Sequence, residues 1–246
     1  MAKNLVTLAT VISVRPLGEN NSSVTLLTRS EGIIFATMYG GSKSRLKSLV
    51  SPWNTGTAYL SISNQTQYKI SDFDVSAYHL TFRENLTKNC IASLAAEIAI
   101  KTKCAGSPVT CWALINGFIN GLDKCQNSEQ CTSGLIRFLW RYLETMGIKP
   151  ETEICCHCGN KFHQGAFWNQ IENGFNCTGC GSSSLFYITQ NGLNYLNNIS
   201  LSSTSDTESE ELEKDSIAGL KQLLFFLIEN ACGSKLSSLK TGTGIL

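Results

Sequence analysis

Two matched cysteine pairs are the residues of this chain whose type and spacing most clearly predict chemistry. Cys155 and Cys158 form one C-x2-C pair, and Cys177 and Cys180 form a second pair after an 18-residue spacer. Each pair places two thiolates on one tight turn, so two such turns present four sulfurs in the tetrahedral arrangement that Zn2+ accepts. Because four thiolates leave no open position for water, the spacing predicts one structural zinc ion per chain, which orders its own segment and performs no hydrolysis.

Other roles for these cysteines stay open on spacing alone. One C-x2-C pair could act in thiol redox chemistry, although two matched pairs are present and neither opens the helix of a βαβ unit. Cys156, His157 or His163 could replace one zinc ligand, although the spacing favours Cys155 and Cys158. The other cysteines share no spacing and are predicted to be small buried hydrophobic side chains on or near helical faces: Cys90, Cys104, Cys111, Cys125, Cys131 and Cys232.

A basic segment is the second candidate site. Lys43, Arg45 and Lys47 stand within five residues, directly after Gly40, Gly41 and a serine. Cations on a glycine-flanked loop neutralise phosphates and release condensed counterions, so the segment is predicted to contact a nucleic-acid backbone. An ordinary solvated loop is the alternative. Aromatic side chains nearby could offer surfaces for base stacking, although by themselves they are more typical of a core: Tyr39, Trp53, Tyr59 and Tyr68.

The amino-terminal third of the chain must position the basic segment. Apolar and polar residues alternate there in short runs that Gly, Asn, Ser and Pro separate, which predicts strands. Five short strands with meander turns predict a small OB-fold barrel at residues 1–76. The predicted strands are 6–14, 24–29, 33–38, 57–62 and 68–75.

From about residue 77 the apolar spacing becomes helical, and it continues to the end of the chain with one interruption. Residues 151–186 are rich in Cys, Gly and aromatic residues without helical periodicity, so a metal would supply their order. The predicted fold is therefore α+β, with a helical domain at 77–246 that carries a zinc-ribbon-like insert at about 151–186. Its helices are predicted from a stripe of Leu80, Leu86, Cys90, Leu94 and Ile98, and at 109–121, 129–147, 192–198 and 217–231.

Composition narrows the class of protein further. The 246 residues are 42% hydrophobic and 16% charged, which excludes a disordered chain, and no apolar run reaches the ~18 residues of a membrane span. The first strand lacks the features of a secretory signal, so we expect a reducing cytoplasm. The net charge of +1 combines seven basic and four acidic residues (+3) at 1–82 with nine basic and thirteen acidic residues (−4) at 106–246. A nucleic-acid-binding surface is therefore expected to be local.

Eight different short motifs are distributed along the chain. They lie at the first strands, at the basic segment, on the helix that ends at residue 147, at the first cysteine pair and near the carboxyl terminus. They are RPLGE at 15–19, VTLLT at 24–28, GGSKSRL at 40–46, PW at 52–53, LIRF at 135–138, MGIKP at 146–150, CCHCG at 155–159 and GSKLSS at 233–238.

These motifs together resemble the RecO family of bacterial recombination mediators over nearly the whole chain. The resemblance implies a non-enzymatic, nucleoid-associated protein that binds single- and double-stranded DNA and anneals complementary strands. It also implies that the protein, with RecR and sometimes RecF, helps load RecA onto DNA covered by single-stranded DNA-binding protein (SSB). Arg15 and Lys69 would join the basic segment in neutralising phosphates. Arg137 matches a helical arginine that holds the acidic SSB tail, although an arginine in a local ion pair is an equal alternative.

Two other classes of function stay open. A zinc or thiol enzyme would need an open metal position or a thiol beside a base, and His79, His157 and His163 stand in no recognised catalytic spacing. A protein-binding adaptor would use the barrel without contacting DNA.

Overall fold

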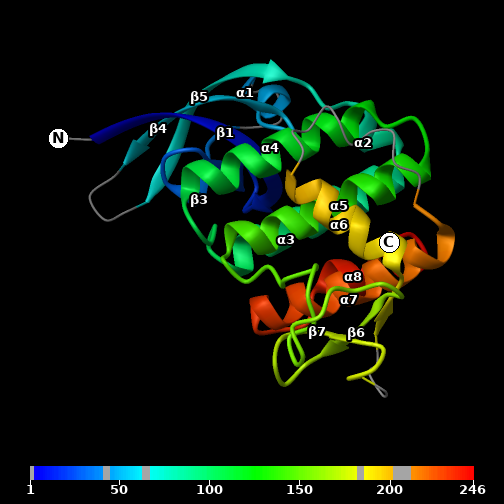
Figure 1. Cartoon of the computed structure of the whole chain (residues 1–246). Helices are drawn as coiled ribbons and strands as arrows, with labels where there is room; N and C mark the ends of the chain where they lie inside the picture. The colour runs from blue at the N-terminus through cyan, green and yellow to red at the C-terminus, as the bar shows by residue number, and fades with distance from the viewer. Residues whose placement is uncertain (1–2, 41–44, 63–66, 182–185, 202–211) are drawn as a thin grey trace. The chain divides into compact units, whose positions relative to one another are not determined.

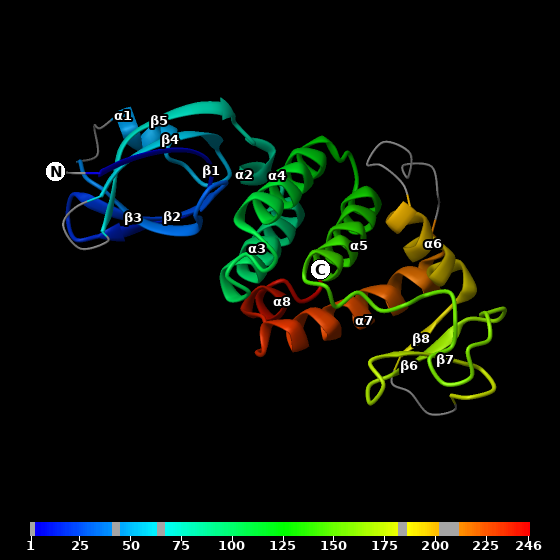
Figure 2. The same cartoon turned by 60° about the vertical axis from the view of Figure 1, so that its left-hand side comes forward.

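The amino-terminal strands close into a barrel. The computed structural model describes residues 3–40, 45–62, 67–181, 186–201 and 212–246. Its first five strands are hydrogen-bonded in the order β1-β2-β3-β5-β4, and β1 also pairs with β4, which closes the sheet (Figures 1 and 2). This order is that of an OB-fold, so the predicted fold class is confirmed. The strands are β1 (Lys3–Leu17), β2 (Asn21–Thr28), β3 (Gly32–Met38), β4 (Thr55–Ile62) and β5 (Tyr68–Ala77).

Alternate residues of the strands fill the barrel. Leu26 and Phe73 are fully buried, and Ile34 is 3% exposed, as expected for side chains that point to one face of a closed sheet. β4 and β5 approach each other closely at Gly56, where a Cβ atom would lie 2.0 Å from the carbonyl oxygen of Asp74. A glycine at this register shift therefore lets the two strands pair.

The basic segment differs from its prediction. Residues Arg45–Leu49 form the helix α1, so Arg45 and Lys47 do not lie in a loop. Leu46 and Leu49, three residues apart, pack against the barrel core, which explains the helical conformation. Lys43 lies outside the described residues.

Three helices follow the barrel, and each begins at a recognisable residue or break. α3 begins after Asn85, whose side chain accepts a hydrogen bond from the Lys88 amide, and α4 begins after Ser107, which caps the Thr110 amide. α4 contacts β2 and β3 of the barrel, and α3 contacts both α4 and the carboxyl-terminal α8. The bounds are α2 (Thr81–Glu84), α3 (Leu86–Lys101), α4 (Pro108–Lys124) and α8 (Ser237–Thr241).

The stripe predicted for the first of these helices is only partly correct. Leu94 and Ile98 are fully buried, but Leu80 and Leu86 are 53% and 64% exposed. The chain breaks at Asn85 between α2 and α3, so a single helix does not carry that spacing.

The remaining elements form a small sheet and three helices. The sheet has the order β7-β6-β8, and α7 contacts both α6 and β8. None of the helices in the described part of the chain is long and apolar enough to cross a membrane. The bounds are α5 (Ser128–Thr145), β6 (Ala166–Asn169), β7 (Gly174–Cys177), β8 (Tyr187–Ile188), α6 (Gln190–Leu201) and α7 (Lys214–Cys232).

The chain forms two compact units. One comprises Met1–Cys131 together with Leu236–Leu246, and the other comprises Thr132–Lys235. The first unit holds the barrel and the helices α2 to α4, and the second holds the four predicted zinc ligands. The division into 1–76 and 77–246 stays a prediction.

Candidate metal centre and nucleic-acid interface

The structure brings the two cysteine pairs together. The sulfur atoms of Cys155, Cys158, Cys177 and Cys180 all lie within 4.8 Å of one another, and Cys158 Sγ is 3.8 Å from Cys177 Sγ. Cys155 is buried, whereas Cys158 and Cys180 are exposed. Four sulfur atoms converging at one point could hold a metal ion, and thiolate is the ligand that soft and borderline ions such as zinc prefer.

Each pair lies on a tight turn, as the C-x2-C spacing predicts. The Gly159 amide donates to the carbonyl oxygen of Cys155 at 2.9 Å, and the Gly181 amide donates to that of Cys177 at the same distance. Gly159 has a φ of +73°, a conformation that a side chain would disfavour. The turns also supply amide donors toward the sulfurs, since Cys177 N lies 3.3 Å from Cys155 Sγ.

These contacts separate the acidities of the thiols. Burial raises the pKa of Cys155, but amide hydrogen bonds from Cys158, Cys177 and His157 outweigh it and lower that pKa to about 6. Hydrogen bonds to the thiols of Cys158 and Cys177 raise the pKa of Cys180 to about 12. The cluster therefore favours a thiolate first at Cys155, the one buried ligand.

Cys156 does not join the cluster, although the spacing left it open as a ligand. Its thiol lies 3.0 Å from Glu172 Oε2 and 2.9 Å from Asn176 Oδ1, and burial together with Glu172 raises its pKa to about 12. His157 Nδ1 lies 3.9 Å from Glu172 Oε1, and His163 is exposed. The four cysteines of the two pairs are thus the set that the structure assembles in the described residues.

Aromatic side chains pack the hairpin that carries the second pair. Trp168 on β6 and Phe175 on β7 are paired residues, and their rings meet edge to face with centroids 5.3 Å apart. Phe162 is buried as well, and Phe167 packs on Tyr187. Of the six cysteines predicted to be hydrophobic, three are buried and three are half-buried: Cys104, Cys111 and Cys131, and Cys90, Cys125 and Cys232.

The predicted DNA-binding cations lie on the barrel. Arg15 is exposed near the end of β1, opposite Ser23, and Arg45 is exposed at the start of α1. Lys47 is half-buried on the same helix, and α1 contacts β5, which carries the exposed Lys69. The structure therefore places these cations on one barrel, on strands and a helix that the sequence separates.

The aromatic residues near these cations have different roles. Tyr39 is 51% exposed, and Lys69 Nζ lies 4.9 Å from the centroid of its ring. Trp53 is buried, and Tyr59 donates to Asp74, which raises the pKa of Tyr59. The sequence prediction missed Phe35, which is 63% exposed on β3. Both Ile34 and Phe35 are apolar, and Phe35 is distinguished from a core residue only because Ile34 points into the barrel and Phe35 points out of it.

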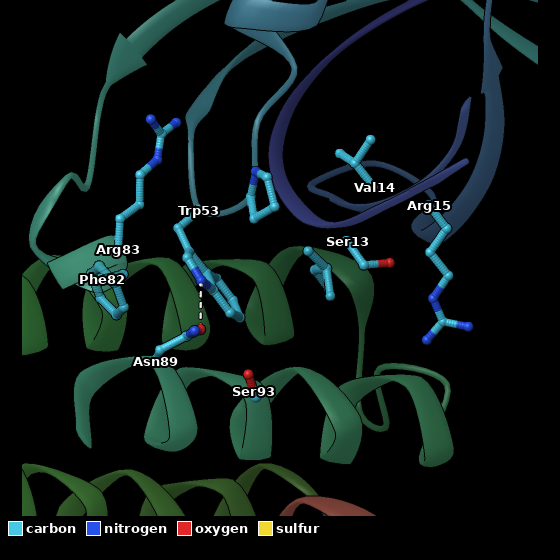
Figure 3. A pocket seen from close by; sticks show the side chains of 10 residues that line it. Ser13, Val14, Arg15, Trp53, Phe82, Arg83, Asn89 and Ser93 are labelled. Atoms are coloured by element: carbon cyan, nitrogen blue, oxygen red, sulfur yellow. Dashed lines mark hydrogen bonds between the residues drawn. The ribbon is translucent and has the colours of Figure 1, made fainter. Parts of the chain in front are cut away.

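A groove on the same unit adds a second residue that sequence reasoning missed. The groove has a volume of about 380 Å3 and lies between the end of β1, the residues before β4, and the helices α2 and α3 (Figure 3). Arg15 and Arg83 are its charged lining residues, and the buried rings of Trp53 and Phe82 lie beneath its surface. Arg83 lies 68 residues after Arg15 in the sequence and just outside residues 1–82, whose charges were summed for the barrel. Only the fold brings the two arginines to one groove.

Comparison with known proteins agrees with this architecture. The family model described as "Recombination protein O N terminal" matches residues 1–78, and "Recombination protein O C terminal" matches residues 83–240. The chain belongs to the RecO family. It is 30% identical over 181 residues to the DNA repair protein RecO of Bacillus pumilus, covering 72% of this chain and 69% of the relative. It is 26% identical over 176 residues to that of Myxococcus xanthus, covering 70% and 71%.

Family membership settles the class of function. RecO proteins are non-enzymatic recombination mediators, so the prediction that this chain is no enzyme is confirmed. Of the three histidines considered for an enzyme, His79 has a structural role, because it is buried and hydrogen-bonds to the carbonyl oxygen of Trp53 and the side chain of Asn120, both at 2.7 Å.

Arg137 lies in the second unit of this RecO-family protein. It is half-buried on α5, one turn before Arg141. Burial, together with the positive charge of Arg137, lowers the pKa of Arg141. Two arginines this close on one helix face repel each other, so an anion beside them would be stabilised.

Proposed function

We propose that this RecO-family protein binds single- and double-stranded DNA through its barrel and anneals complementary strands. With RecR, and sometimes RecF, it would help load RecA onto single strands covered by SSB. The observation that carries the proposal is the collection of exposed cations on one small barrel: Arg15, Arg45 and Lys69 together with the half-buried Lys47. Lys43 belongs to the same proposed set.

The proposed mechanism is electrostatic. Two DNA strands repel each other, and cations on a common surface lower that repulsion by neutralising phosphates and releasing counterions. The β2–β3 face adds the exposed ring of Phe35, and Tyr39 lies directly beyond β3, so unpaired bases would find stacking surfaces beside the cations. An OB-fold commonly binds oligonucleotides on this face.

Zinc is the metal that the four-cysteine cluster would hold, with Cys155, Cys158, Cys177 and Cys180 as ligands. Four thiolates complete a tetrahedral shell, so the ion would stabilise the β6–β7 hairpin and take no part in DNA chemistry. Arg137 would pair with the acidic tail of SSB, and the protein would work beside the nucleoid in the cytoplasm.

The test is strand annealing by the purified protein. Replacing Lys43, Arg45 and Lys47 with Gln removes up to three phosphate contacts, so the slope of log affinity against log salt should flatten by about 2 for single strands. Annealing should slow in parallel. The matched control replaces the exposed Lys124, Lys161 and Lys214 with Gln, which removes the same charge outside the barrel.

An unchanged slope in the triple variant would show that the basic segment does not contact DNA. The adaptor alternative makes a different prediction, because a barrel that binds only protein would fail to retard an oligonucleotide in a gel even at low salt.

A further inference from the structure

The groove beside Arg15 and Arg83 carries a positive charge that no side chain in its lining balances. Ten residues line it, and its two ionised side chains are both arginines (Figure 3). Both arginines are exposed. Such a lining favours a ligand with anionic groups, since nothing in the groove repels them.

The apolar wall of the groove is held in a defined conformation. Trp53 has a φ of +70°, which is unusual for a residue with a side chain, and three hydrogen bonds hold it, one of them from its amide to the Val11 carbonyl oxygen at 2.7 Å. Its indole Nε1 donates to Asn89 Oδ1 at 3.1 Å, and its carbonyl oxygen bonds His79. Its ring also packs on Phe82, with centroids 5.8 Å apart. The wall is thus already formed before a ligand arrives.

Arg83 keeps hydrogen-bonding capacity for a ligand. Its Nη2 donates to Ser51 Oγ at 2.7 Å, which holds the side chain at the edge of the groove. A guanidinium carries five N–H donors in a planar fork, so the others can bind a phosphate or carboxylate in bidentate geometry.

The groove continues toward the proposed DNA-binding helix. A second hollow of about 280 Å3 shares Val14 and Pro52 with the first one and includes Lys47 of α1 in its lining. Lys47 therefore lines the hollow that adjoins the one lined by Arg15 and Arg83. A chain of regularly spaced anions fits such a series of cations better than a single anion does.

We propose that this groove binds single-stranded DNA, with phosphates at Arg15 and Arg83 and an unpaired base against the exposed Pro52, above the buried Trp53. The proposal rests on the proposed function and extends it to a strand preference. A duplex keeps its bases paired and stacked inside, so it cannot place a base in the groove, whereas a single strand can turn one outward. An acidic peptide is the competing ligand of similar charge.

The experiment compares Arg83→Gln with Arg29→Gln. Arg29 is an exposed arginine directly after β2 that lies outside the groove lining, so its loss measures the effect of one positive charge alone. Fluorescence anisotropy measures the affinity of the full-length protein for a labelled oligothymidine and for a labelled duplex. R83Q should weaken single-strand binding by roughly tenfold and flatten its salt slope by about 0.7, while its duplex affinity matches that of R29Q.

Two further measurements test the base-binding wall. Ser93→Phe fills the groove from α3 without removing a cation, so it should weaken single-strand binding while leaving the salt slope unchanged. An abasic oligonucleotide of equal length should bind the unmutated protein more weakly than oligothymidine. Thermal melting followed by circular dichroism confirms that each variant is folded.

The outcomes separate the two proposals. If the unmutated protein binds neither strand nor duplex, the proposed function itself fails. If it binds DNA but R83Q matches R29Q on single strands, or both single-strand and duplex affinities fall equally, the groove assignment is wrong. Retained DNA binding together with R83Q-sensitive binding of an acidic peptide would assign the groove to a protein partner.

Discussion

The carboxylate of Glu97 on α3 accepts the backbone N–H of Ser238, 141 residues further along the chain, at 2.7 Å. Its other oxygen accepts the Ser237 amide at 2.9 Å, so one side chain caps the first turn of α8. No residue of α8 itself supplies a side-chain cap. This contact attaches the carboxyl-terminal segment to the unit that holds the barrel.

Replacing Glu97 with Gln should destabilise that unit. The amide group retains one acceptor oxygen and loses the negative charge that favours a helix N-terminus, so we expect the free energy of unfolding to fall by about 1 kcal/mol. Urea denaturation at neutral pH measures the change. Lys101→Met is the control, because it removes the ion pair of Lys101 with Glu97 and leaves both amide contacts in place. A larger loss in that control would assign the effect to the ion pair.

The contribution of Glu97 should depend on pH. Burial raises the pKa of Glu97, but hydrogen bonds from Ser238 and Ser237 outweigh it and lower that pKa below its usual value. Because the folded-state pKa is below the unfolded one, the stabilisation is complete above the unfolded pKa and is lost as the pH falls through the folded pKa. The stability difference between the unmutated protein and E97Q should therefore be constant down to about pH 5 and shrink below about pH 4. A difference independent of pH would contradict this.

The four-cysteine cluster predicts a sharp contrast between neighbouring cysteines. Cys158→Ser removes one of the four converging sulfurs, whereas Cys156→Ser alters a thiol that contacts Glu172 and Asn176. The unmutated protein and C156S should each retain close to one zinc per chain. C158S should lose affinity by more than the ~10–100-fold typical of an outer-shell change. Zinc content after competition with a chelator measures this, and equal losses in both variants would refute the assignment.

Phe35 predicts an effect on binding without an effect on stability. Its ring is 63% exposed on β3, so Phe35→Ala should change the free energy of unfolding by less than about 0.5 kcal/mol. If bases stack on it, single-strand affinity should fall by about 1 kcal/mol or more. Val6→Ala shortens another exposed apolar side chain of the barrel, 58% exposed on β1, and should leave affinity unchanged. Equal affinities of F35A and V6A would exclude Phe35 from the interface.

Replacing His79 should reduce the stability of the protein. It is buried, and both ring nitrogens are bonded, one to the Trp53 carbonyl and one to Asn120 on α4. His79→Ala would leave a cavity and unpaired polar groups, so we expect a loss of about 2–4 kcal/mol in the free energy of unfolding. His163→Ala, at an exposed position, should be neutral. Thermal denaturation compares the two, and a neutral H79A would contradict the structural role.

Several features followed from the sequence because local chemistry decides them. Alternating residues indicated five strands, and the C-x2-C pairs indicated two turns, because period-2 alternation and thiolate spacing are properties of a few neighbouring residues. The bounds of β3 and β5 differ from the prediction by at most two residues at either end. The spacing alone identifies Cys155, Cys158, Cys177 and Cys180 as one set of ligands, and their sulfur atoms converge in the structure.

Other features depended on contacts between distant residues. Phe35 and Ile34 are both apolar, so only closure of the barrel decides which one is buried. The glycines and cations of the basic segment predict a loop, but Leu46 and Leu49 gain burial against the barrel core when Arg45–Leu49 is helical.

By itself, the sequence determined the barrel, the helical remainder, the two cysteine turns and the resemblance to the RecO family. Only the tertiary structure decided that Arg83 lies in one groove with Arg15, that Cys156 contacts Glu172 and Asn176, and that Glu97 caps α8. The physical reason is the same in each case. Periodicity and spacing report the conformation of neighbouring residues, whereas a groove or an interhelix cap depends on how separate elements pack.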